Sequence, residues 1–142
     1  MPVKVTCPVD ANSSFFFMDE KRALTQDIRP LKILILNLMP NKSVTEQQLL
    51  RLLGNTALQV EVSFLTTATY QSKNTPKSYL KTFYQTFDQV KHSRYDALLI
   101  TGSPVEHMDF EDVTYWAELL EILDWANENV FSSYFICWAA QA

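Results

Sequence analysis

Cysteine, glycine and long apolar runs are scarce in this sequence of 142 residues. The two cysteines, Cys7 and Cys137, lie far apart and do not form a disulfide framework. No charged segment followed by an apolar one opens the chain, so a signal peptide is not indicated. We therefore expect a reducing, cytoplasmic setting. The longest aliphatic stretch, residues 31–38, is interrupted by Lys32 and Asn37 and is too short to cross a bilayer, so we expect no membrane span.

Positive charge is also sparse. The net charge is −4, and the 12 lysines and arginines are spread thinly along the chain. Such a distribution offers no basic surface for nucleic acid or for an anionic membrane, so we expect neither as a partner. The hydrophobic content of 47% is ample for the core of one domain.

Aliphatic segments of strand length alternate with segments of helical periodicity. After an N-terminal arm over residues 1–30, which we expect to pack through Phe15, Phe16 and Phe17, strands are predicted at 31–38, 58–65, 95–102 and 130–137. Helices are predicted at 45–55, from 75 through Phe87, and within 109–129. This order predicts an α/β fold over residues 31–142, with a three-layer, mostly parallel, flavodoxin-like sheet.

Three unusual loops follow predicted strands: residues 37–42, residues 101–107 and the turn at Cys137. The carboxyl ends of parallel strands meet at one edge of the sheet, so we expect these loops to converge there.

Cys137 stands where an aromatic-rich strand gives way to small residues that favour a helix. A cysteine in an apolar run is usually a small buried side chain. At a sharp turn from strand to helix, however, it would be exposed above the sheet as a nucleophile. The loops that converge beside it favour the second interpretation.

Several motifs strongly resemble the homoserine O-acyltransferase family, from about Arg29 to Ala142. They are Ile28 to Pro40, Thr45-Glu46 with Gln48, Asn74-Thr75-Pro76, Thr101-Gly102-Ser103-Pro104, Tyr115-Trp116, and Cys137-Trp138-Ala139 with Gln141. This family comprises the transsuccinylases and transacetylases of methionine biosynthesis, and its fold is like that of class I glutamine amidotransferases.

The resemblance implies a ping-pong acyl transfer from an acyl-CoA, through a cysteine thioester, to L-homoserine. Cys137 matches the nucleophile, and Trp138 and Lys42 match the positions whose backbone amides form the oxyanion hole. Neither a cofactor nor a metal is implied, because the acyl-CoA is a substrate. A homodimer is one state that we consider for the full-length enzyme.

We expect modest roles for three polar residues in or near the 37–42 loop. The Lys42 side chain reads as solvated, and Glu46 reads as a capping residue of the helix that begins near Thr45. We assign Asn41 no catalytic role, because some relatives have lysine at its position.

The family's catalytic histidine and the glutamate that orients it lie well downstream of the nucleophile and have no match in this chain. We expect His92 to be a surface residue and His107 to be on the surface or beside the donor pocket. The sequence therefore reads as a piece of a longer enzyme that does not turn over alone, with apolar sheet surface left uncovered beyond the last strand.

Glu106 decides the expected acyl donor. The resemblance places it where succinyl-using relatives have glycine and acetyl-using relatives have glutamate. A carboxylate there would repel the carboxylate of a succinyl group, so we expect acetyl-CoA as donor.

Alternatives remain open at this point. The donor could be succinyl-CoA and the acceptor L-serine. A glutamine amidotransferase or other cysteine hydrolase would use the same turn, although amidotransferases usually have glycines beside the cysteine, and here the neighbours are Ile136 and Trp138. A non-catalytic flavodoxin-like domain with an inert cysteine is the third possibility.

Overall fold

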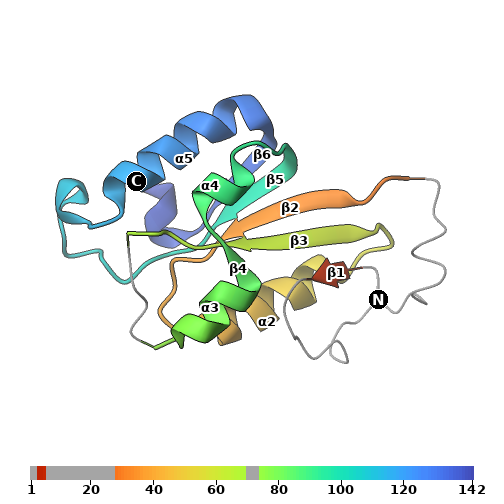
Figure 1. Ribbon diagram of the computed structural model, residues 1–142, viewed down its shortest axis with the longest axis horizontal. Helices are drawn as coiled ribbons and strands as arrows, with labels where there is room; N and C mark the ends of the chain where they lie inside the picture. Colours follow the sequence, from red (N-terminus) through yellow and green to blue (C-terminus); the bar gives the residue numbers. More distant parts are fainter. Residues whose placement is uncertain (1–2, 6–27, 70–73) are drawn as a thin grey trace.

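The computed structural model describes residues 3–5, 28–69 and 74–142 (Figure 1). The strands are β1 (Val3–Val5), β2 (Leu31–Leu36), β3 (Val60–Leu65), β4 (Tyr84–Gln85), β5 (Tyr95–Ile100) and β6 (Val130–Phe135). The helices are α2 (Lys42–Leu53), α3 (Lys77–Phe83), α4 (Phe87–Val90) and α5 (Trp116–Asn129), with short 3-10 helices η2 (Phe110–Asp112) and η3 (Cys137–Ala140). Cys7 and the three phenylalanines of the arm lie outside the described residues.

The strands form one parallel sheet in the order β1-β3-β2-β5-β6. β4 also pairs in parallel with β3, at the end of β3 opposite to the end that pairs with β1. From β2 onward, each connection between successive strands contains one of the helices α2, α3, α4 and α5, as crossovers between parallel strands usually do. The predicted α/β fold is therefore confirmed. The short strand β1, inside the segment that we expected to be only an arm, was not predicted.

Helices cover both faces of the sheet, which gives three layers (Figure 1). On one face α5 and α4 pack over a core that includes Leu34, Leu98 and Ile122. On the other face α2 and α3 pack over Ile35, Val62 and Phe64. Strand β2 has buried residues facing both layers, as its continuous aliphatic sequence predicted.

Two helix predictions need correction. The helix expected from residue 75 through Phe87 is interrupted, because Tyr84 and Gln85 pair with the end of β3 instead. A new helix, α4, then starts after Thr86, whose amide donates to the Gln89 side chain at 2.9 Å. The second correction concerns α2, which begins at Lys42, three residues before the predicted start.

Aromatic side chains of β6 are exposed at the edge of the sheet. Phe131 is 93% exposed, Tyr134 66% and Phe135 37%. The prediction of uncovered apolar surface at this strand is therefore confirmed. None of the helices within the described residues is both long enough and apolar enough to cross a membrane.

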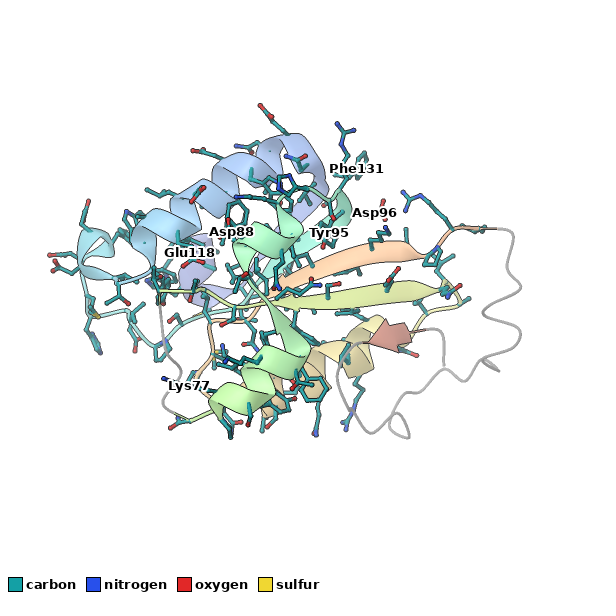
Figure 2. All side chains as sticks on the ribbon, in the orientation of Figure 1. Lys77, Asp88, Tyr95, Asp96, Glu118 and Phe131 are labelled. Carbon is teal, nitrogen blue, oxygen red and sulfur yellow. The ribbon has the colours of Figure 1, made fainter. Side chains whose placement is uncertain are left out.

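Asp96 connects the segment before β2 to the start of β5. Its carboxylate accepts hydrogen bonds from both terminal nitrogens of Arg29, at 2.7 and 2.6 Å, and from the Lys32 amide at 2.8 Å. In Figure 2 Asp96 lies near Phe131, on the side of the molecule remote from Glu118. The hydrogen bonds from Arg29 and Lys32 lower the pKa of Asp96 to about 2.

We expect Asp96→Asn to lower the free energy of unfolding at pH 7 by about 1 kcal/mol or less, because exposed ion pairs contribute little. A carboxyl whose pKa is depressed in the folded state stabilises above its unfolded pKa of about 3.9. The difference between wild type and variant should therefore shrink as the pH falls below about 5 and vanish only near pH 1, below the folded pKa of about 2. Urea unfolding across this range measures it, with Asp124→Asn on α5 as the control; a difference that is as large at pH 2 as at pH 7 contradicts this account.

Candidate active site

Cys137 occupies a strained turn at the end of β6. Among the non-glycine residues that the structure describes, only Cys137 has a positive φ, of 55°. Its side chain is exposed. Strand β6 ends at Phe135, and η3 begins at Cys137 itself. Non-glycine residues with such backbone angles concentrate at functional sites, and the nucleophile of a strand-turn-helix elbow is one example. The predicted sharp turn from strand to helix at Cys137 is confirmed, while the role of Cys137 as a nucleophile stays a prediction.

Gly102, just beyond β5, allows this turn to pack closely. A Cβ atom added to Gly102 would lie 3.1 Å from the Cys137 Cβ and 3.6 Å from its Sγ. The first distance is shorter than ordinary van der Waals contact. Only glycine leaves the Cys137 side chain undisturbed at this position.

Backbone hydrogen bonds hold the three predicted loops side by side. The Ile136 amide donates to the Ile100 carbonyl at 3.0 Å, and the Thr101 amide donates to the Leu36 carbonyl at 3.1 Å. The Thr101 hydroxyl oxygen in turn accepts from the Leu38 amide at 2.8 Å. The loops therefore converge at the carboxyl ends of β2, β5 and β6, as the sequence predicted.

A cavity of about 640 Å³ opens between these loops and α2. Cys137, Trp138 and Glu106 all contribute to its lining, so the predicted nucleophile and the predicted donor selector face one space. The other lining residues are Met39, Thr45, Gln48, Leu49, Thr101, Gly102, Ser103, Pro104, Ile136 and Gln141. A cavity of this size, largely apolar with few polar groups, suits a small ligand.

The buried Trp138 side chain anchors the turn at Cys137. It is 3% exposed and packs against the rings of Tyr115, Trp116 and Phe110, with centroids 6.0–6.4 Å away. Nearby, the hydroxyls of Ser103 and Tyr115 share a hydrogen bond of 2.6 Å. These contacts hold Trp138 in one orientation, as an oxyanion-hole amide would need.

The two amides expected to form the oxyanion hole stand at helix starts. Lys42 is the first residue of α2 and Trp138 the second of η3, so neither amide has an acceptor within its own helix. Among the described residues, no backbone oxygen outside the helices accepts a hydrogen bond from the Lys42 or the Trp138 amide. Their joint role at the Cys137 thioester stays a prediction.

The Lys42 side chain is not solvated, contrary to the sequence-based expectation. It is 2% exposed, and its ammonium group donates to the carbonyls of Asn37 and Met39 and lies 5.4 Å from the centre of the Tyr84 ring. Burial lowers the pKa of Lys42 to about 8, and the Glu46 carboxylate opposes that shift. Lys42 is therefore an internal cation that holds the loop before α2.

Glu46 is not a capping residue, so that expectation was wrong as well. It lies in the second turn of α2, is 1% exposed, and accepts hydrogen bonds from the hydroxyls of Tyr84 and Tyr79, the latter at 2.6 Å. Burial, and next the hydrogen bond to Glu46, raise the pKa of Tyr84 well above its ordinary range. The only signal in the sequence was the spacing of four residues between Lys42 and Glu46, which places both on one helix face.

Neither histidine stands at the cavity. The His107 side chain is 93% exposed, with Nε2 3.8 Å from Oε1 of Glu106, and His92 is exposed in the turn before β5. Both expectations of a surface position are confirmed. In the described ranges, no group of three or more histidine, cysteine or acidic side chains is placed to hold a metal ion.

Glu118 of α5, which sequence inspection did not single out, holds the loop after β3. Its carboxylate accepts from the amides of Ala68 and Thr69, at 2.9 and 3.2 Å, and from the Thr69 hydroxyl at 2.8 Å. Nothing in the sequence marks this residue, because its partners lie 49 and 50 positions away.

Comparison with known proteins agrees with this geometry. A family model described as homoserine O-succinyltransferase matches residues 7–142. A homoserine O-acetyltransferase of Acetivibrio thermocellus is 55% identical over 147 aligned residues, covering 100% of this chain and 48% of that protein. A homoserine O-acetyltransferase of Lysinibacillus sphaericus is 63% identical over 127 residues, covering 89% of this chain and 41% of that protein.

A third relative, a homoserine O-acetyltransferase of Clostridium beijerinckii, is 55% identical and again covers 100% of this chain and 48% of its own length. The chain thus spans about half the length of the curated relatives it matches. Because the family model and these relatives extend over nearly all of the sequence, the chain belongs to the homoserine O-succinyltransferase family.

Proposed function

We propose that this chain carries the cysteine nucleophile and the acyl-donor cavity of a homoserine O-acetyltransferase of methionine biosynthesis. The reaction transfers the acetyl group of acetyl-CoA to L-homoserine and yields O-acetyl-L-homoserine and CoA. The observation that carries the proposal is Cys137, held at a positive φ at the edge of a cavity that Glu106 also lines. The names of the relatives support the same reaction.

In the first half-reaction the Cys137 thiolate attacks the acetyl carbonyl of acetyl-CoA. The carbonyl oxygen becomes an oxyanion, which the amides of Trp138 and Lys42 stabilise by hydrogen bonds. When the tetrahedral intermediate collapses, CoA leaves as a thiolate and takes up a proton, and the acetyl group remains on Cys137 as a thioester. No cofactor beyond the substrate is needed.

In the second half-reaction the γ-hydroxyl of L-homoserine attacks this thioester and releases the Cys137 thiolate. The hydroxyl must lose its proton to a base. The resemblance assigns that base to a histidine downstream of the nucleophile. Neither His92 nor His107 suits this role, because both are exposed and neither lines the cavity. We therefore expect the 142-residue chain to stop at the acetylated form.

A second candidate donor, succinyl-CoA, is favoured by the description of the matching family model. Glu106 favours acetyl-CoA, because its carboxylate lines the cavity that a succinyl carboxylate would have to enter. An amidotransferase activity is disfavoured by the family match over residues 7–142.

The test is acetylation of the protein without acceptor. The 142-residue chain is incubated with acetyl-CoA, and its intact mass is measured over time. We expect one added acetyl group, located by peptide mapping on Cys137 and not on Cys7. An unmodified protein, or an acetyl group on another residue, would remove Cys137 as the acyl carrier.

A further inference from the structure

A cluster of five buried or half-buried polar residues lies beneath the 37–42 loop: Asn37, Lys42, Glu46, Tyr79 and Tyr84. Asn37 and Glu46 are each 1% exposed and Lys42 is 2% exposed. In the described part of the chain, none of the five is among the residues that line the cavity beside Cys137. Their contacts with one another therefore need an explanation other than direct contact with a substrate.

Asn37 and Lys42 tie together both ends of the loop. The Asn37 side chain accepts from the Met39 amide at 3.1 Å and donates to the Lys42 carbonyl at 3.4 Å. The Lys42 ammonium group donates back to the carbonyls of Asn37 and Met39. The conformation of the loop, and with it the direction of the Lys42 amide, depends on these internal contacts.

Tyr84 and Glu46 complete the cluster, and the hydrogen bonds among its members fix which group donates and which accepts. The Asn37 amide group donates to the Tyr84 hydroxyl oxygen at 2.9 Å, so the single hydroxyl proton of Tyr84 is free to go to Glu46. Tyr79 donates its own proton to the other carboxylate oxygen at 2.6 Å. Glu46 must accept on both oxygens, which an ionised carboxylate does and a neutral amide does not.

We propose that Glu46 and Tyr84 are positioning residues for the acylation of Cys137: their cluster fixes the 37–42 loop so that the Lys42 amide faces the acyl carbonyl. This inference rests on the proposed function. The Glu46 carboxylate acts on the buried Lys42 ammonium as a counter-charge, and Tyr84 links that carboxylate to Asn37. Buried groups of opposite charge are seldom more stabilising than apolar side chains of the same volume, so the role of the cluster is better sought in geometry.

The test compares two reactions of the same thiol in the 142-residue chain. Acetylation by acetyl-CoA passes through an oxyanion, whereas alkylation by iodoacetamide does not. Glu46→Gln should slow acetylation at least about tenfold, because removal of one oxyanion-hole donor costs about 10² to 10³ in rate. The alkylation rate should stay within about twofold. Glu121→Gln, an exposed glutamate of α5, makes the same change of charge and should alter neither rate.

Tyr84→Phe is the second variant, because it keeps the ring that packs on Phe64 and removes only the hydroxyl. It should show the same selective loss of acetylation. Equal loss in both reactions would indicate a general structural role and overturn the proposal, as would unchanged acetylation in both variants.

Hydrogen exchange separates this inference from the proposed function. In Glu46→Gln the amides of Leu38 and Met39, which donate to the Thr101 hydroxyl and to the Asn37 side chain, should exchange at least about tenfold faster than in wild type, while those of β5 stay protected. If wild-type protein is not acetylated, the proposed function fails, and faster exchange confined to the loop still supports the positioning role. Unchanged exchange in the loop would overturn that role whatever the chemistry.

Discussion

Cys137→Ala is expected to abolish acetylation of the protein by acetyl-CoA while leaving its stability almost unchanged. Removal of the nucleophile in enzymes with a comparable covalent mechanism costs about 10⁶ in rate, so no adduct should accumulate on the time scale of the wild-type reaction. The two measurements are intact mass and the midpoint of urea unfolding.

Stability should survive because the Cys137 side chain is exposed and contributes no packing to either core cluster. Alanine carries the same Cβ as cysteine, so it meets the same backbone cost at a φ of 55° and the same close approach of Gly102. We expect a change in the free energy of unfolding within about 0.5 kcal/mol.

Cys137→Ser is the matched variant, since it retains a nucleophilic atom of lower reactivity. It should be acetylated far more slowly than wild type and remain equally stable. An adduct that persists in Cys137→Ala would place the acyl group elsewhere, and a large loss of stability would mean that the thiol is structural.

The sheet could be predicted because its signal is local. An aliphatic run such as residues 31–38 suits a strand buried on both faces, and the alternation of strands with helices then requires parallel order. The convergence of the loops at Cys137 follows from that topology alone.

Features that depend on distant partners could not be predicted in the same way. Residues 84–85 continue a helical spacing of aromatic side chains, yet they pair with β3 because an open strand edge is available there. Local periodicity contains no information about that edge. The same limit hid β1, which pairs with β3 from Val60 onward, more than fifty positions away.

The Lys42 and Glu46 cluster shows this limit at the site itself. Charged residues in a loop and in the first turns of a helix are usually solvated, so composition favoured a solvated side chain for Lys42 and a capping role for Glu46. The partners that make burial tolerable, Tyr79 and Tyr84, lie 33 and 38 positions beyond Glu46. By contrast, Glu106 could be placed at the same cavity as Cys137 from topology and resemblance.

Glu106→Gly is expected to shift the preferred acyl donor from acetyl-CoA toward succinyl-CoA. Glu106 and Cys137 line the same cavity, so a succinyl group on its way to Cys137 brings its terminal carboxylate near that of Glu106. Two unit charges about 4 Å apart repel by about 4 kcal/mol at an effective dielectric constant near 20.

The exposure of Glu106 reduces this repulsion. Its side chain is 59% exposed, so we take about half of the Coulomb value, which still corresponds to more than tenfold in the ratio of the two donors. Acetyl-CoA has no charge on its acyl group and should lose little. The measurement is the second-order rate of Cys137 acylation by each donor in wild type and variant.

Glu106→Gln separates charge from volume, because glutamine fills the same space without the negative charge. If repulsion dominates, this variant should gain most of the succinyl-CoA reactivity that Glu106→Gly gains; if exclusion of the longer chain dominates, only the glycine variant should gain it. Wild-type protein that prefers succinyl-CoA, or a donor ratio that neither substitution changes, would show that Glu106 does not select the donor, and the description of the family model would then be the better guide to the substrate.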